Sequence, residues 1–392
     1  MARRSGKAHD GELVQMQTAI IKTIHSKAIK AILLTLLWLA ATMLPKAAVR
    51  AQSGESAWVQ AVSIANAPST TEPVVVAGPQ GKVQAFWWDE SQGLTTVVYD
   101  GSQWLPPEAS QIAPLSEQAE GAGYAARVGE MPAIIDDGLG WAHAFWLGAE
   151  DARKGARPLL HSRLAVGTSN WDRPKQVTDA ATAWSVAATT GGALYLIYFC
   201  PTDTANRPAG VYHQRSFDGG LNWTPPVALS TSPDFRNTRE AAGLQIAVSA
   251  KGDVYATWDD PQTNQAMLTS SDDGGRNWQE PQPVGTSDLN ARRAQIIPGR
   301  ENELLLLWEA SRSGLATGIY QQRSLNSGQT WSDPEQVMDS WAMSMQGITL
   351  LPLPNGQVWM LAGSQPGTLD LFIWDGEQAS DSETVGWPKV QS

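Results

Sequence analysis

Residues 252–281, GDVYATWDDPQTNQAMLTSSDDGGRNWQEP, contain the pattern that decides the fold. An apolar stretch ends at Trp258, and a second stretch rich in β-forming residues ends at Ser271. A glycine-rich turn then leads to Trp278 and Pro281. Short apolar stretches between turns of this kind are typical of antiparallel strands. The segment therefore predicts two strands and a tight turn that leads into a further strand.

The first half of this segment recurs along the chain. In each of six copies, a residue that closes an apolar strand follows a turn residue at a distance of six positions. The copies are Gly81-KVQAF-Trp87, Gly140-WAHAF-Trp146, Gly192-ALYLI-Tyr198, Gly252-DVYAT-Trp258, Asn302-ELLLL-Trp308 and Gly356-QVWML-Ala362. The closing positions lie 59, 52, 60, 50 and 54 residues apart, so one repeated unit explains most of the 392 residues.

The second half recurs as a Trp that is followed three residues later by Pro. The pairs are Trp104/Pro107, Trp171/Pro174, Trp223/Pro226, Trp278/Pro281 and Trp331/Pro334, with a degenerate Trp387-Pro388 in the last copy. Pro can begin an outermost strand because a sheet edge tolerates a missing N–H donor. Each copy thus supplies four strands, and four-stranded units repeated radially predict an all-β, six-bladed β-propeller over residues 55–392.

Two other architectures fit less well. The copies are longer than the blades of Trp-Asp repeat propellers, which span about 40–45 residues. A β-sandwich would not produce six copies in phase. A further stretch, Trp58-VQAVSI, resembles an outermost strand. We expect it to pair into the last blade and close the ring, with the strand at Trp387 as the alternative.

Residues 1–51 have the features of an export signal. An uncharged apolar run of 14 residues, Ala31–Leu44, follows Lys22, Lys27 and Lys30. This run is too short for a spanning helix, which needs about 20 residues. Val49-Arg50-Ala51 offers small residues for cleavage ahead of Gln52. We expect a secreted or otherwise extracytoplasmic protein; the alternatives are an uncleaved membrane anchor, a buried helix, and a true start at Met16.

Charge and cysteine content restrict the partners. Loss of residues 1–51 would leave 20 of 28 basic and 37 of 39 acidic residues, a net charge of −17. Such a surface repels nucleic acid and anionic lipid. The single cysteine, Cys200, excludes a disulfide framework and is predicted to be a core or rim thiol. We therefore expect no nucleic acid, metal or cofactor, and a monomer that contacts a membrane only through an uncleaved N-terminal segment.

Three turns share the pattern Ser-x-Asp-x-Gly-x-x-Trp, with Asn for Asp in the third. In such a turn the acid or amide accepts backbone N–H bonds, Gly adopts a positive φ, and Trp is expected to fold under the turn as a hydrophobic plug. The turns resemble the Asp boxes of the bacterial neuraminidase repeat (BNR) proteins of the sialidase superfamily, over roughly residues 55 to 392. In that family the boxes are structural and lie opposite the active site. The resemblance implies this structural role for Ser216, Asp218, Gly220, Trp223, Ser271, Asp273, Gly275, Trp278, Ser324, Asn326, Gly328 and Trp331.

The same resemblance implies a demanding catalytic set: three arginines that bind the substrate carboxylate, a Tyr nucleophile helped by a Glu, and an Asp acid/base. At the place of the first arginine this chain has Glu72, in Thr71-Glu72-Pro73. The loop expected to carry the nucleophile, residues 336–347, contains no Tyr, and none follows Tyr320. We therefore expect a degenerate catalytic site, and no residue is assigned a catalytic role.

Candidate ligand-binding residues lie in loops at the end where each innermost strand begins. They are Arg127, Arg239, Glu240, Arg292, Arg293 and Trp341. We expect Arg292 and Arg293 to lie immediately before a first strand; the alternative is that all these arginines are merely solvated. The aromatic residues Trp341, Tyr124 and Phe235 could stack on a sugar or fill small gaps in packing.

Other polar residues are expected to serve structure. Asp136 and Asp137 fall in a turn between first and second strands, away from the expected site. His143 and His161 lie in strand patterns and are predicted to be half-buried without a metal.

Three functions remain open on the sequence alone. The first is a non-catalytic or degenerate propeller that binds an extracellular glycan or a protein. The second is an active exo-sialidase or related glycoside hydrolase that acts on extracellular glycans. The third is a structural or assembly role. Convergence of a carboxylate pair and arginines at the mouth of the central channel would distinguish the second function from the first. The third predicts a flat polar face without a pocket.

Overall fold

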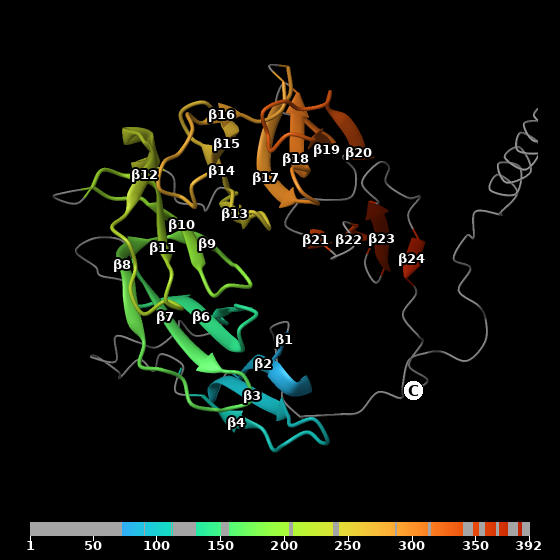
Figure 1. The fold of residues 1–392 in the computed structure, drawn as a ribbon. Helices are drawn as coiled ribbons and strands as arrows, with labels where there is room; N and C mark the ends of the chain where they lie inside the picture. Colours follow the sequence, from blue (N-terminus) through green and yellow to red (C-terminus); the bar gives the residue numbers. More distant parts are fainter. Residues whose placement is uncertain are drawn as a thin grey trace, which may run out of the picture. The chain divides into compact units, whose positions relative to one another are not determined.

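The computed structural model describes residues 73–374 and 383–385, apart from residues 90, 111, 113–130, 150–156, 204–206, 238–242, 287, 313–314, 340–347, 353–356 and 366–367. Its strands form six four-stranded antiparallel sheets that follow one another along the chain (Figure 1). Each sheet holds its strands in sequence order, so neighbours in the chain are neighbours in the sheet. The predicted all-β, six-bladed β-propeller is confirmed.

The strands have the following bounds. The first sheet holds β1 (Val74–Ala77), β2 (Val83–Asp89), β3 (Gly93–Tyr99) and β4 (Glu108–Ala109), and the second holds β5 (Ala133–Asp136), β6 (Trp141–Leu147), β7 (Arg157–Ala165) and β8 (Lys175–Ala181). The third holds β9 (Ala183–Ala188), β10 (Leu194–Cys200), β11 (Gly210–Ser216) and β12 (Val227–Thr231), and the fourth holds β13 (Gln245–Val248), β14 (Val254–Asp260), β15 (Gln265–Ser271) and β16 (Gln282–Pro283). The fifth holds β17 (Asn290–Pro298), β18 (Leu304–Arg312), β19 (Leu315–Ser324) and β20 (Glu335–Asp339), and the sixth holds β21 (Ile348–Pro352), β22 (Val358–Gln365), β23 (Thr368–Trp374) and β24 (Glu383–Val385). Short 3₁₀ helices occur at η1 (Pro79–Gly81) and η2 (Pro233–Asn237). Within the described residues, no helix has the length and apolarity needed to cross a membrane.

Four of the repeated closing residues, Trp146, Tyr198, Trp258 and Trp308, lie in the core between successive sheets. Trp258 is 1% exposed and packs in one cluster with Ile197 of the third sheet and Ile246 of the fourth. Trp308 is fully buried in the next cluster, which joins the fourth and fifth sheets. Further shared clusters join the first sheet to the second, the second to the third, and the fifth to the sixth. In these four copies the six-residue spacing marks a residue that one sheet buries against its neighbour, whereas Trp87 packs on residues of its own sheet.

The three Asp-box turns each follow a third strand, as expected. In the first, Ser216 Oγ accepts a hydrogen bond of 2.8 Å from the Gly220 N–H and donates one of 2.8 Å to Asp218 Oδ1. Burial raises the pKa of Asp218, but hydrogen bonds from the Asn222 backbone and side chain and from Ser216 outweigh it and lower that pKa to about 2. Ser271 and Ser324 make the same 2.8 Å bonds to the glycines of their own turns. The box tryptophans are half-buried, so each covers the turn without entering the core fully.

Among the three Asp-box glycines, Gly220 has the closest neighbour. Its φ is +78°, and an added Cβ would lie 2.0 Å from Cε1 of the buried His161. At the equivalent Gly328, with φ +85°, the nearest atom would be Leu304 Cδ1 at 3.4 Å. Gly328→Ala is expected to cost about 1–2 kcal/mol for the left-handed backbone. Gly220→Ala should cost about 1–3 kcal/mol more because it also overpacks the site. Urea unfolding of both variants checks this, and equal losses would contradict the predicted contact with His161.

The sixth sheet differs from the expectation in one respect. Its outermost strand, β24, ends at Val385 and so precedes Trp387, whereas in the other sheets the repeated Trp precedes the fourth strand. The degenerate Trp387-Pro388 is therefore not in the repeated position. The fourth place in this sheet is taken by a C-terminal segment, and the segment at Trp58 lies outside the described residues.

Candidate functional site

A β-bulge places two successive arginines at the start of β17. The pairing of β17 with β18 changes register between Arg292 and Gln295, and Arg293 has a φ of +49°. Gly243 allows this close packing, since a Cβ there would lie 2.8 Å from the Arg293 Cα. A bulge bends the strand and redirects side chains. The expectation that both arginines precede the first strand was wrong, because the strand begins at Asn290 and continues through the bulge.

The buried carboxylate of Asp259 faces this bulge from the end of β14. Its Oδ1 accepts a hydrogen bond of 2.8 Å from the Arg293 backbone N–H, and Oδ2 lies 3.8 Å from a guanidinium nitrogen of Arg292. The side chain is only 5% exposed. Burial raises the pKa of Asp259, although the Arg293 N–H and the two guanidinium groups act in the opposite direction. Asp259 is thus a carboxyl group that holds its proton more strongly than usual.

Glu309, in the second half of β18, completes the group. Its Oε2 accepts a hydrogen bond of 2.7 Å from Arg293 Nη1, and both side chains are partly exposed. Arg292 donates to Asn264 Oδ1. We call Asp259, Arg292, Arg293 and Glu309 the arginine–carboxylate cluster. Two cations and two anions alternate in it, so its formal charge is zero when both carboxylates are ionised.

The structure accounts for only part of the predicted site. Arg292 and Arg293 enter the cluster, whereas Arg127, Arg239, Glu240 and Trp341, together with Tyr124, lie outside the described residues. Phe235 is 1% exposed and packs on Phe199 with ring centroids 5.5 Å apart, so it fills space in the core.

Asp259 and Glu309 were not predicted as site residues, although the sequence carried a signal for them. Each directly follows the closing aromatic residue of its repeat, where earlier copies have Trp88, Leu147 and Phe199. An acidic residue in place of an apolar one in two successive copies indicates that this position does not serve the apolar core in these copies. The β-bulge that brings Arg293 to both carboxylates has no comparable signal.

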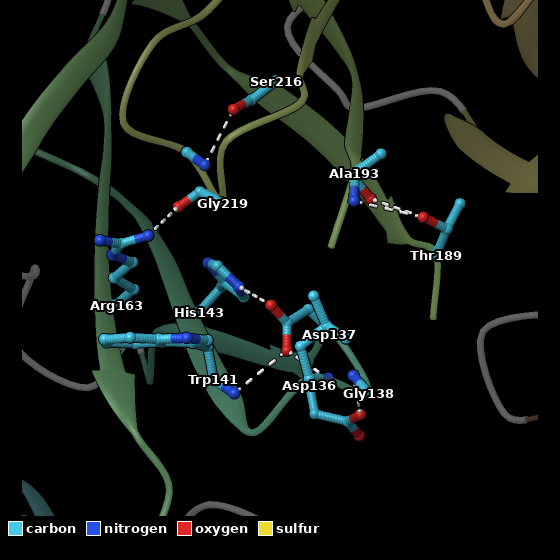
Figure 2. A network of polar contacts seen from close by, with 12 residues as sticks. Asp136, Asp137, Gly138, Trp141, His143, Arg163, Thr189, Ala193, Ser216 and Gly219 are labelled. Atoms are coloured by element: carbon cyan, nitrogen blue, oxygen red, sulfur yellow. Dashed lines mark hydrogen bonds and ion pairs between the residues drawn. The ribbon is translucent and has the colours of Figure 1, made fainter. Parts of the chain in front are cut away.

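A second polar network lies at the other end of the strands, around the turn between β5 and β6 (Figure 2). Asp137 Oδ1 accepts the Leu139 and Trp141 N–H groups at 2.9 and 3.0 Å. Its Oδ2 lies 3.5 Å from Nε2 of His143, whose Nδ1 is 3.0 Å from Nε2 of His161. Both histidines are fully buried, not half-buried as expected, because their rings fill the space between neighbouring sheets. Asp137 lies in the predicted turn, whereas Asp136 is the last residue of β5; both are away from the arginine–carboxylate cluster.

Cys200 belongs to a third polar group, at the end of β10. Its buried thiol donates to Thr202 O at 3.3 Å, as expected of a core or rim thiol. Nearby, Arg207 donates to the Tyr198 hydroxyl at 3.0 Å and to Asp179. These contacts join the second and third sheets, so we assign this group to structure.

The arginine–carboxylate cluster can act in two chemical ways. Its guanidinium and carboxylate groups can donate to and accept from the hydroxyl groups of a ligand. In addition, a buried carboxyl group with a raised pKa, such as Asp259, is suited to proton transfer.

Comparison with known proteins places the chain in a family. Residues 140–390 match the family described as BNR repeat-like domain. No curated protein matches the chain. Among solved structures, an ulvan lyase is 13% identical, with 79% of this chain and 82% of that one covered and a TM-score of 0.53.

Two other solved structures are more distant in shape. A leech intramolecular trans-sialidase is 12% identical over 79% of this chain and 68% of its own, with a TM-score of 0.45. The Aleuria aurantia fungal lectin, described as a six-bladed β-propeller, is 9% identical over 81% and 96%, with a TM-score of 0.43. These values indicate a shared fold only for the ulvan lyase. Because the family match spans most of the chain, the chain belongs to the BNR repeat-like domain family.

Proposed function

We propose that this protein is an exported, glycan-binding β-propeller that contacts its ligand through the arginine–carboxylate cluster and has no efficient sialidase activity. One observation carries the proposal: Arg293 brings two carboxylates and a second arginine together at the end of the propeller where the innermost strands begin. Glycan binding needs only favourable contacts in the ground state, which such a cluster can supply.

The sequence and the contacts of the arginines both argue against sialidase chemistry. Glu72 stands where the family has an arginine, and no Tyr follows Tyr320. Arg292 and Arg293 are already bonded to Asn264 and Glu309. An anionic ligand would have to compete with these acceptors, so strong selection for a sugar carboxylate is not expected at this cluster.

We expect Arg293→Ala to weaken glycan binding about tenfold to a hundredfold, because each charge-assisted hydrogen bond contributes about 1.5–3 kcal/mol. A glycan array identifies the best oligosaccharide, and calorimetry of that oligosaccharide measures the change. Arg312→Ala is the matched control, since Arg312 is 61% exposed and pairs with Asp288 outside the cluster.

The same samples test the absence of sialidase activity. Unchanged binding by Arg293→Ala would contradict the proposed site. Turnover of a fluorogenic sialoside at the rate of ordinary sialidases would contradict the degenerate catalytic set.

A second candidate, hydrolysis or cleavage of another glycan, is favoured by the raised pKa of Asp259 beside Glu309. In this case Asp259 would donate a proton to the leaving oxygen. Asp259→Asn retains an acceptor for the Arg293 N–H but removes the proton. Loss of activity on a panel of fluorogenic glycosides, with binding retained, would support catalysis; an inactive wild-type protein would reject it.

Export is a separate proposal that rests on residues 1–51. The apolar run with basic residues before it and small residues after it supports removal ahead of Gln52. N-terminal sequencing of protein from the native host tests the cleavage. An intact N-terminus in the soluble cytoplasmic fraction would contradict both cleavage and anchoring.

A further inference from the structure

The Asp-box turns pack against the preceding sheet through a repeated pair of side chains. On β7 these are His161 and Arg163, which contact the turn of the third sheet; Arg163 Nη1 donates to Asp218 O at 3.3 Å and Gly219 O at 3.4 Å. On β11 the equivalent residues are His213 and Arg215, and Arg215 donates to Gly274 O in the turn of the fourth sheet. In both places an imidazole and a guanidinium fill the space between two sheets.

The fourth sheet lacks this pair. By strand register, Leu268 on β15 pairs with Thr257 as His161 pairs with Phe145 and His213 with Ile197. Two residues later, Ser270 stands where β7 and β11 have arginine, and β19 again has Arg323. The fourth sheet therefore presents a leucine and a small hydroxyl to the Asp-box turn of the fifth sheet.

An open cleft occupies the place of the missing side chains. Its volume is about 680 Å³, and its walls include Leu268 and Ser270 from the fourth sheet and Gly328 and Gln329 from the fifth. The matching place between the second and third sheets, lined by the corresponding His161, Arg163, Gly220 and Leu221, has only about 10 Å³. Small-molecule pockets typically have volumes of about 300–1,000 Å³. The junction that has Ser270 in place of an arginine is therefore open and of ligand size, whereas the junction that has Arg163 is filled.

The lining of this cleft selects a class of ligand. Trp331 and Leu306 contribute apolar surface, and four glutamines contribute amides: Gln279, Gln282, Gln322 and Gln329. Asp253, Asp272 and Glu280 contribute carboxylates, and no Lys or Arg occurs among the described residues that line the cleft. Amides and carboxylates pair with hydroxyl groups, an indole packs on sugar C–H groups, and the excess of negative charge repels anions.

We propose that the cleft between the fourth and fifth sheets binds an uncharged sugar unit of a glycan. This site is distinct from the arginine–carboxylate cluster, because Asp253 and Tyr255 of the cleft lie at the start of β14 and Asp259 at its end. Asp259 lies six positions after Asp253 along this extended strand, which corresponds to about 20 Å. The two proposals can therefore fail independently.

The decisive variant is Ser270→Arg, which restores the guanidinium of the other sheets. We expect it to fill the cleft and weaken binding of neutral oligosaccharides by at least about tenfold, while the protein stays folded. Gln92→Arg is the matched control, since it adds the same charge at an exposed turn of the first sheet. The probes are neutral oligosaccharides and their sialylated counterparts of equal length, titrated against the full chain.

A second variant keeps the test valid if Ser270→Arg does not fold. Gln329→Ala shortens a side chain that lines the cleft, and Leu221→Ala makes the equivalent change at the filled junction. We expect weaker binding for Gln329→Ala and no change for Leu221→Ala. The proposal is overturned if no neutral oligosaccharide binds, if Gln329→Ala and a folded Ser270→Arg bind as the wild type does, or if sialylation leaves the affinity of this cleft unchanged.

Discussion

Replacement of Trp258 by Ala is expected to lower the free energy of unfolding by about 3–5 kcal/mol. The side chain is 1% exposed and lies in the cluster shared by the third and fourth sheets, with Ile197 and Ile246. Removal of the indole leaves a cavity whose walls belong to two sheets. Each sheet is held by its own ladder of backbone hydrogen bonds, so the walls can close this cavity only in part.

Denaturant unfolding followed by circular dichroism measures this loss. The control is Trp278→Ala, because Trp278 is half-buried on an Asp-box turn at the edge of the same cluster. We expect a smaller loss for the control. A Trp258→Ala variant no less stable than Trp278→Ala would show that the repeated closing residues do not form the main core.

Acidification is expected to destabilise the propeller through its buried histidines. Burial, then the nearby His143 and Arg163, lower the pKa of His161 to about 3, and burial lowers the pKa of His213 to about 4. In the unfolded chain these groups regain a pKa of about 6.5 and bind protons that the folded chain excludes. As far as these two histidines are concerned, the free energy of unfolding is therefore highest above about pH 6.5 and decreases as the pH falls toward 4.

Each histidine should contribute a slope of about 1.4 kcal/mol per pH unit between those limits. His213→Gln removes one such group, whose Nδ1 lies 3.0 Å from Leu196 O. We expect the variant to show a shallower dependence of unfolding free energy on pH between 4 and 6.5, and the same dependence as the wild type between 7 and 8. Parallel curves over the whole range would contradict burial of a neutral imidazole at this position.

The architecture could be predicted from the sequence because its information is local and repeated. Six closing residues and five Trp/Pro pairs fixed the number of sheets and the order of their strands. The Asp-box turns could also be predicted from the sequence, because Ser216, Asp218 and Gly220 form their hydrogen bonds with one another within a few residues of chain. The degenerate last copy was misplaced at Trp387 because it retained too little of the pattern.

The sites depended on contacts between sheets that no local pattern encodes. The β-bulge at Arg293 determines which carboxylates the arginines contact. These carboxylates, Asp259 and Glu309, lie 34 and 16 positions from Arg293 in the sequence. Ser270 looks like an ordinary strand residue in the sequence, yet the space that it leaves exists only because the turn of the next sheet lies opposite. The sequence by itself determined the repeated unit, through short-range periodicity and turn chemistry. Only the tertiary structure decided the arginine–carboxylate cluster and the cleft, because both are made where side chains of different repeats meet.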